Sequence, residues 1–382
     1  MLRIFAAECL FSLVVWAMQE VPRGRGVWTL AGMILVAASL PLLVALAHQR
    51  REPPARASAR ILAWGGTVFA LAQFAFAIAM LIKPKVLDIG VTTLAAILAA
   101  AHGDNPYLLP IDRIAGGITD AGERFHGYKY LPVMMADYAP FCLSFGIRGI
   151  ILTNIALQTA ITLAIGSAAA QGGRRLAGLA AMALYLSLPF VAHQIFTRGV
   201  TDIAAILPLL AALCLIDTRP GWAGFLVGLS VATKLVPGIV ALPCLLPGPG
   251  SRRAYLCGAA LGLLPILPFA ATAPDGFLAN VILFNTLRPV DDTSWLFGLP
   301  AFTAIAARAA AALILLGIAL RLWRQTPGLD ERCAWTVLAI LTVLAVGPDI
   351  HHNYYLWFLP FLAVLAGRAA IGDIAPPIPR AT

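Results

Sequence analysis

The sequence predicts an all-α, polytopic transmembrane protein with about 10–12 spans, since one span takes about 20 apolar residues. Of its 382 residues, 60% are apolar and 12% are charged, and the mean hydropathy is +0.86. A soluble domain carries about 25% charged residues, so this chain lacks the charge that would cover a surface in water. The composition therefore excludes a soluble enzyme and predicts helices solvated mainly by lipid.

Apolar runs that are interrupted by charges and by Gly/Pro clusters predict the individual spans. We place them at 4–19, 27–48, 61–82, 149–170, 176–194, 201–216, 222–248, 254–273, 298–320, 333–347 and 354–367. The run 222–248 contains Lys234 and Pro237 near its middle. We therefore expect two short helices there, with the chain turning back at Lys234.

The formal net charge of +9 indicates orientation in a membrane rather than binding of nucleic acid, because the arginines gather in short loops near span ends. The clusters are Arg50, Arg51, Arg56 and Arg60; Arg174 and Arg175; Arg252 and Arg253; and Arg321 and Arg324. If all four face the cytoplasm, the crossings between them are even in number only when 222–248 is split. The loop 83–148 then faces outward from the inner (plasma) membrane.

The chain is divided into three parts. Residues 1–60 hold the first two predicted spans, residues 61–370 hold the remaining spans, and residues 371–382 form a Pro-rich cytoplasmic tail. The outer loop 83–148 is the longest non-spanning stretch and is rich in polar residues, which is typical of a functional loop. Within it, 91–101 is apolar with a helical pattern, which predicts an interfacial helix.

Asp88 comes shortly after the 61–82 span and has apolar neighbours at 86, 87 and 89. A carboxylate in such surroundings is expected to be partly desolvated, which raises its pKa and suits a general base. The alternative interpretation is a cap at the N-terminus of the following helix.

The segment 102–107 reads His-Gly-Asp-Asn-Pro-Tyr. Its glycine and proline are typical of a helix end, and this interpretation stands beside a functional one, in which the segment lines a polar pocket. The candidate substrate-binding residues of the loop are Asp104, Asn105, Tyr107 and Tyr128.

Ionisable residues at or inside apolar runs are functional-site hypotheses. Lys234 could hold a phosphate, and snorkelling of its ammonium to the interface is the alternative. Asp202 begins a span and either pairs with Arg198, four residues earlier, or contacts substrate. Arg288 lies in an outward loop, where it could bind a phosphate or a carboxylate.

A polar and aromatic cluster precedes the last span, formed by His351, His352, Asn353 and Tyr354. Adjacent histidines do not share a helix face, so a metal ion held by both is not expected. His and Asn can hydrogen-bond sugar hydroxyls, and the aromatic rings suit stacking on a sugar. The alternative is an interfacial aromatic belt.

The order of these motifs resembles a known family. After the aspartate that follows a span, the chain carries Gly103-x-Asn105-Pro106-Tyr107, Tyr130-Leu-Pro132, Gly199 with Asp202, Gly228 with Lys234 and Pro237, and Asn353-Tyr354-Tyr355. Over about 61–370 it looks like the multi-span, lipid-linked glycosyltransferases of the GT-C fold. The similarity is greatest to the bacterial branch of polyprenyl-phosphate-mannose-dependent mannosyltransferases (GT87-like).

The resemblance implies an inverting transfer of a mannose-like pentose or hexose from a polyprenyl phosphate to a hydroxyl of a glycan or glycolipid at the outer face. Asp88 would be the general base, with Asp104 as its rival. Lys234 and Arg288, with Arg198 behind them, would stabilise the leaving phosphate.

The implied partners are the lipid-linked donor, the acceptor and membrane lipid, with no cofactor and no catalytic metal. The alternative function is a multi-span transporter or lipid flippase. Such a protein would show internal repeats and charges near the bilayer midplane, whereas the polar residues of this chain cluster toward one face.

Overall fold

The computed structural model describes residues 54–111, 127–284, 290, 293–348 and 351–372. These residues are 78% helix and include no strand, which confirms the all-α prediction. The predicted spans 4–19 and 27–48 lie outside the described residues, as does Arg288. The chain divides into two compact units.

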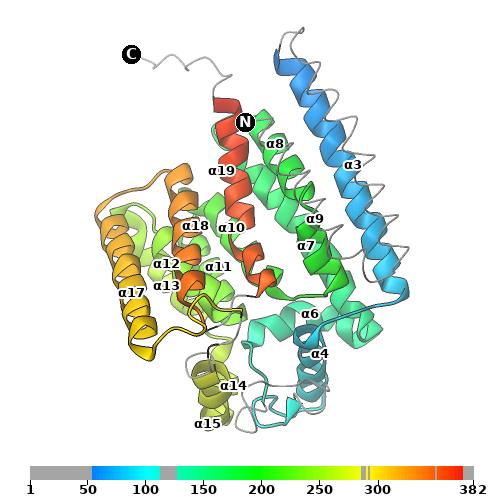
Figure 1. The fold of residues 1–382 in the computed structure, drawn as a ribbon, viewed down its shortest axis with the longest axis vertical. Helices are drawn as coiled ribbons and strands as arrows, with labels where there is room; N and C mark the ends of the chain where they lie inside the picture. The colour runs from blue at the N-terminus through cyan, green and yellow to red at the C-terminus, as the bar shows by residue number, and fades with distance from the viewer. Residues whose placement is uncertain (1–53, 112–126, 285–289, 291–292, 349–350, 373–382) are drawn as a thin grey trace. The chain divides into compact units, whose positions relative to one another are not determined.

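Among the described residues, three helices are long and apolar enough to cross a membrane (Figure 1). They are Leu62–Ile82 within α3 (Pro54–Ile82), α7 (Arg148–Ala169) and α17 (Ala301–Arg324). Two bent helix pairs bring the number to five if each is one span, and the remaining apolar helices have 10–17 residues. The expected total of spans therefore stays a prediction.

The first unit contains, among its described residues, 54–79, 162–193 and 362–372. Its helix α8 (Arg175–Leu186) is followed by α9 (Pro189–Ala192), and the helix axis bends there by 60°. Proline lacks an N–H group, so Pro189 cannot extend the hydrogen bonds of α8. The Nε2 of Gln73 instead donates to the free carbonyl of Leu186 at 2.7 Å, which satisfies the end of the helix.

The second unit comprises residues 80–161 and 194–361. In it, α11 (Pro220–Thr233) ends and α12 (Leu235–Cys244) begins at Lys234, whose backbone is extended with φ −147° and ψ 123°. A Cβ at Gly238 would lie 2.4 Å from the backbone nitrogen of Val231, so α12 folds back closely along α11. The predicted break of the 222–248 run at Lys234 is confirmed.

Helices α11 and α13 (Arg252–Gly262) approach so closely that only glycine fits at their contact. A Cβ at Gly258 would lie 2.0 Å from the carbonyl oxygen of Gly221, and one at Gly262 would lie 2.3 Å from that of Phe225. Small residues allow such contact between helices in lipid. Both contacts advance by four residues on each helix, so α11 and α13 run in the same direction. In the chain, α12 connects them and folds back along α11.

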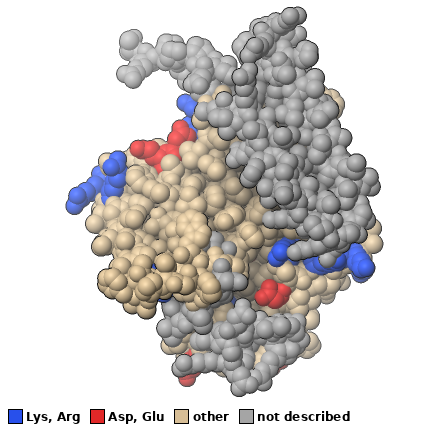
Figure 2. Space-filling view, viewed as in Figure 1, with Lys and Arg blue, Asp and Glu red and all other residues tan. Residues whose placement is uncertain are grey.

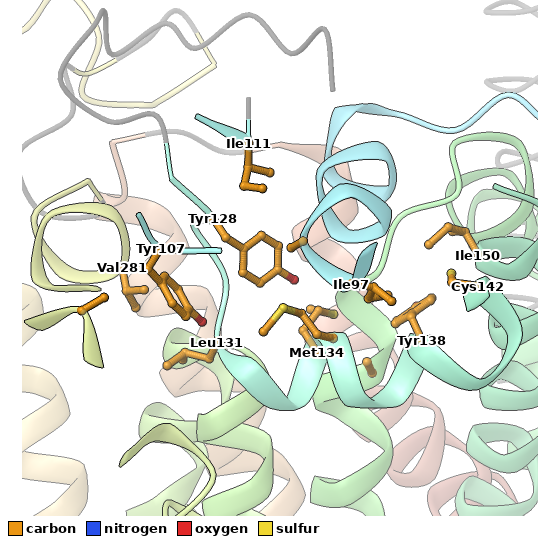
Figure 3. Packing of buried hydrophobic residues seen from close by; sticks show 14 residues of the cluster. Ile97, Tyr107, Ile111, Tyr128, Leu131, Met134, Tyr138, Cys142, Ile150 and Val281 are labelled. Carbon is orange, nitrogen blue, oxygen red and sulfur yellow. The ribbon is translucent and has the colours of Figure 1, made fainter. Parts of the chain in front are cut away.

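The described part of the predicted outer loop contains two helices. They are α4 (Asp88–Ala101), which covers the helix expected at 91–101, and α6 (Pro132–Phe145). Their buried side chains form one apolar cluster, in which Figure 3 shows the rings of Tyr107 and Tyr128 among Ile97, Met134 and other apolar residues. This packing fixes the loop segments that carry the polar residues.

Charged groups occupy a small part of the surface. On the face drawn in Figure 2, the Lys, Arg, Asp and Glu side chains of the described residues form small groups separated by a broad uncharged area. Large apolar side chains are exposed on the helices, among them Trp64, Phe302, Ile305 and Leu313. Such a surface is suited to lipid rather than to water.

Candidate active site

A buried ion pair marks the centre of the candidate site. The Nζ of Lys234 lies 2.5 Å from Oδ1 of Asp202, and their side chains are 12% and 0% exposed. Lys234 is presented by the break between α11 and α12, and Asp202 begins the short helix η5 (Asp202–Ala205). Asp202 is therefore held behind Lys234, and its carboxylate has no surface that a substrate reaches.

The pairing of Asp202 with Arg198, one of the two alternatives from the sequence, is not what the structure shows. Gly199 has φ +58°, and this turn separates Arg198 from the start of η5. The two residues thus do not share one face of a continuous helix, which the four-residue spacing requires. Arg198 is half-buried, and its backbone carbonyl accepts a hydrogen bond from the N–H of Leu87 at 2.8 Å.

Two further donors bind the Asp202 carboxylate. The Nε1 of Trp357 donates to Oδ1 at 2.8 Å, and the Nδ2 of Asn353 donates to Oδ2 at 2.9 Å. Both side chains come from one helix, η8 (His352–Trp357). A buried carboxylate is costly unless it is paired and hydrogen-bonded, so these three donors offset the desolvation of Asp202.

Aromatic rings surround the Lys234 ammonium. Its Nζ lies 5.5 Å from the ring centroid of Tyr130 and 5.1 Å from those of Tyr354 and Trp357. The last two rings are stacked, with centroids 4.5 Å apart. Cations are attracted to aromatic faces at these distances. The ammonium is therefore bounded by rings on several sides and by a carboxylate behind it.

Asp88 belongs to the same unit but differs from its expected environment. It is the first residue of α4, its Oδ1 accepts the N–H of Ile89 at 2.8 Å, and its side chain is exposed rather than partly desolvated. Of its apolar neighbours, Ile89 is buried and Val86 and Leu87 are half-buried. A carboxylate in the first turn of a helix is stabilised by the helix dipole, but the N-cap residue is Leu87, so the interpretation of Asp88 as the cap is wrong.

The Asp88 segment and the ion pair are connected through a short loop. A Cβ at Gly90 would lie 3.1 Å from the carbonyl oxygen of Gly199, three residues before Asp202. The start of α4 therefore packs against the turn at Gly199, and this turn leads directly into the ion pair at Asp202. The start of α4 thus contacts the segment 198–199, which closely precedes Asp202 in the chain.

The structure places two of the predicted pocket residues in the apolar core instead. Tyr107 and Tyr128 are 1% and 0% exposed, and burial raises the pKa of both phenols. The hydroxyl of Tyr107 donates to the carbonyl of Tyr130 at 2.7 Å, and that of Tyr128 is 3.3 Å from Oγ1 of Thr93. Their rings, 5.9 Å apart, belong to the apolar cluster, and that of Tyr107 also packs against Phe269 and Phe277. Both residues therefore support the site rather than line it.

Asp104 and Asn105 follow the end of α4. Gly103 has φ +88°, as expected for a helix stop, and Asp104 is exposed. The Nδ2 of Asn105 donates to Oγ1 of Thr272 at 2.8 Å and its Oδ1 accepts the N–H of Tyr107 at 3.0 Å. Asn105 therefore ties the outer loop to helix α14 (Ile266–Thr272).

The histidines at the start of the last polar cluster are exposed. The ring of His351 lies 5.6 Å from that of Tyr354, and the ring of His352 lies 6.3 Å from that of Tyr355. Tyr354 is half-buried beside Lys234, as is Asn353 beside Asp202. The cluster and the ion pair are therefore joined.

Three residues of this region were not among the predicted site residues. Trp357 and Tyr130 contact Lys234, and Asp137 is half-buried in α6, where burial raises the pKa of its carboxyl to about 7. The sequence did contain a signal for Asp137, because it is the one charged residue in the apolar segment 133–138. No local pattern indicated the contacts of Trp357, because they join segments far apart in the chain.

The described fold and site define an all-helical, membrane-embedded protein with an ionic and aromatic centre. The model of glycosyltransferase family 87 matches residues 128–348, which is more than half of the chain. The chain belongs to this family, and it is a membrane-bound glycosyltransferase. Comparisons with curated proteins and with solved structures gave no match.

The matched stretch includes Asp202, Lys234 and Arg288, whereas Asp88 and the cluster at 351–357 lie outside it. The family decides between the two function classes considered from the sequence, an enzyme and a transporter, in favour of the enzyme. It establishes a sugar donor and an acceptor as the classes of substrate.

Proposed function

We propose that the protein transfers a mannose-like pentose or hexose from a polyprenyl-phosphate donor to a hydroxyl of a glycan or glycolipid acceptor. The observation that carries this proposal is Lys234, whose side chain is 12% exposed and whose ammonium lies among aromatic rings. A phosphate leaving group develops negative charge as its bond breaks, and a fixed cation stabilises that charge. Arg198 and Arg288 are the further candidates for this role.

The proposed chemistry is a single inverting displacement. The acceptor oxygen attacks the anomeric carbon while the bond from that carbon to the phosphate oxygen breaks, and the electron pair leaves with the polyprenyl phosphate. Asp88 takes the proton of the acceptor hydroxyl, and its exposed position at the start of α4 makes it accessible. Asp104, also exposed, is the alternative base.

The sugar is proposed to bind at the cluster that adjoins Lys234. His351, His352 and Asn353 offer hydrogen-bonding groups to its hydroxyls, and the half-buried Tyr354, whose ring is stacked on Trp357, offers an aromatic face. Asn105 and Tyr107 act in this proposal by fixing the outer loop.

In the proposed orientation, this site lies at the outer face of the inner membrane. Arg219 precedes α11 and Arg252 begins α13, and the two helices run in parallel away from these arginines toward the end that carries Lys234. The Nη2 of Arg252 also contacts the carbonyl of Gln325 at 3.4 Å, directly after Arg324 ends α17. Arginines thus gather at one end, which the positive-inside rule assigns to the cytoplasm.

The division of the chain completes the proposal. Residues 61–370 would form the catalytic unit, with two extra spans in 1–60 and a cytoplasmic tail at 371–382.

The direct test compares Asp88→Asn with Asp104→Asn, since both aspartates are exposed in the same loop. In membranes supplied with lipid-linked mannose and an acceptor, Asp88→Asn should lose about 100-fold or more of its transfer rate. Asp104→Asn should stay within about threefold of the wild-type rate, an effect below ~1 kcal/mol. Loss with Asp104→Asn alone would move the base to Asp104, and full transfer by both variants would contradict an aspartate base in this loop.

A further inference from the structure

We propose that Asp202, held by Trp357 and Asn353, is a positioning residue that directs the Lys234 ammonium toward the phosphate of the donor. This inference rests on the proposed function, because it concerns the same leaving group. It assigns a role to two side chains, those of Asp202 and Trp357, that have no direct access to a substrate.

Burial excludes Asp202 from direct contact with a substrate. Its side chain is 0% exposed, and both oxygens already accept hydrogen bonds from Lys234, Trp357 and Asn353. Of the two side chains in the ion pair, that of Lys234 is the one with exposed surface, at 12%. The carboxylate can therefore affect a bound donor only through Lys234.

Lys234 needs such a partner because its side chain is flexible. A lysine has a four-carbon stem with about 2 kcal/mol of rotamer entropy, and its backbone here lies in an extended break between two helices. A catalytic cation is most effective when it is already in place before the reaction. The hydrogen bond to Asp202 uses one N–H of the ammonium and leaves two for a ligand.

Trp357 contributes in two ways at once. Its indole N–H donates to Oδ1 of Asp202, the same oxygen that binds Lys234, while its ring lies 5.1 Å from the Lys234 ammonium. Asn353 lies four residues earlier on η8 and binds the other oxygen. Helix η8 thereby holds both oxygens of the Asp202 carboxylate in place. Because the carboxylate is bound to the Lys234 ammonium, it also fixes the position of that ammonium.

The informative variant is Trp357→Phe, because it removes the indole N–H while both charges and an aromatic ring remain. We expect its kcat/KM for lipid-linked mannose to fall about tenfold, as for the loss of one hydrogen bond to a charged group, with the KM of the acceptor unchanged. Trp222→Phe is the matched control, since Trp222 is exposed near the opposite end of α11. This control should leave both constants as in the wild type.

The same substitution is then made in a background that lacks the ion pair. In Lys234→Met/Asp202→Asn both charges are gone, so no unpaired charge is buried and the double variant should fold. Adding Trp357→Phe to it should cause no further loss, because the indole acts through the ion pair. An equal loss in both backgrounds would overturn the proposal, and so would a wild-type kcat/KM for Trp357→Phe alone.

A binding measurement separates this inference from the proposed function. Purified protein is titrated with a synthetic polyprenyl phosphate, with the matching polyprenol as the control that lacks the phosphate. If the double variant binds the phosphate as tightly as the wild type does, the proposed role of Lys234 fails. If the double variant binds weakly but Trp357→Phe and Asp202→Asn bind as the wild type does, only the positioning role fails.

Discussion

Two ion pairs of the second unit flank the same helix, α10 (Ile206–Leu215), and their exposure is reversed. In the pair of Asp202 and Lys234, the side chain of the aspartate is 0% exposed and that of the lysine 12%. In the pair of Arg332 and Asp217, the side chain of the arginine is 1% exposed and that of the aspartate 61%. The cationic residue is therefore the more exposed partner in the first pair only.

The surroundings of the two pairs agree with this difference. Arg332 binds both oxygens of Asp217, each at 2.9 Å, and so joins the end of α10 to the start of α18 (Leu329–Val346). Lys234 is instead bounded by three aromatic rings. A bidentate arginine pair fixes geometry, whereas an ammonium with free donors can still bind an anion. The comparison separates a structural pair from a functional one.

The largest expected effect is on activity. Lys234→Met should lower kcat for transfer from lipid-linked mannose by about 100-fold or more, as for the loss of one group that stabilises developing charge. Arg332→Met should keep kcat within about threefold of the wild type, because the guanidinium faces no reacting group. Rates are compared at equal amounts of folded protein; equal losses in the two variants would remove the distinction between the pairs.

The second expected effect is on stability. The more destabilising substitution should be that of the cation in one pair and that of the anion in the other. Removing the exposed partner leaves a buried charge without compensation, which costs about 3–5 kcal/mol. Lys234→Met should therefore destabilise the protein more than Asp202→Asn does, and Asp217→Asn should destabilise it more than Arg332→Met does. Thermal unfolding of the four variants in detergent tests this pattern. It would be contradicted if the substitution of the cation were the more destabilising one in both pairs, or if that of the anion were.

The third expected effect concerns pH and a carboxyl that has no role in either pair. Burial raises the pKa of Asp137 from 3.8 to about 7, so the folded protein holds this proton more tightly than the unfolded chain does. Stability should then fall as the pH rises from about 4 to about 7, by about 1.4 kcal/mol for each unit of pKa difference.

Asp137→Asn should flatten this fall and unfold at a higher temperature than the wild type at pH 8. The exposed Asp275 provides the matched control, and Asp275→Asn should keep the pH dependence of the wild type. Melting temperatures between pH 5 and pH 8 are the measurement. An unchanged slope in Asp137→Asn would show that another group causes the dependence.

The smallest expected effect sharpens the structural assignment of Arg332. Arg332→Lys keeps the charge but cannot bind both oxygens of Asp217 in a planar fork. We expect a loss of about 1 kcal/mol in the free energy of unfolding, similar to one hydrogen bond, and a transfer rate like that of the wild type. A stability loss as large as that of Arg332→Met would mean that the fork, rather than the charge, provides the whole interaction.

The sequence was informative where a single residue conflicts with its local pattern. A lysine and a proline inside an apolar run predicted the break between α11 and α12, and the structure confirms it at Lys234. The helix end at Gly103 could likewise be predicted, since its φ of +88° favours glycine. Both features are set by interactions within a few residues, which a sequence pattern can show.

The partners of Asp202 could not be predicted in this way. They come from residues 32, 151 and 155 positions away in the chain, whereas the local spacing offered only Arg198 or a substrate as a partner. The expected desolvation of Asp88 also failed, because the apolar neighbours pack inward while the carboxylate stays at the surface. Such outcomes depend on how the helices pack, and a short motif carries no information about that.

The most direct test of the central claim is an experimental structure of the protein with bound polyprenyl phosphate. The account predicts a phosphate oxygen within hydrogen-bond distance of Nζ of Lys234, with Asp202 still bound to Trp357 and Asn353 behind it. A phosphate bound elsewhere, with the Lys234 ammonium enclosed by its aromatic rings and out of reach, would contradict it.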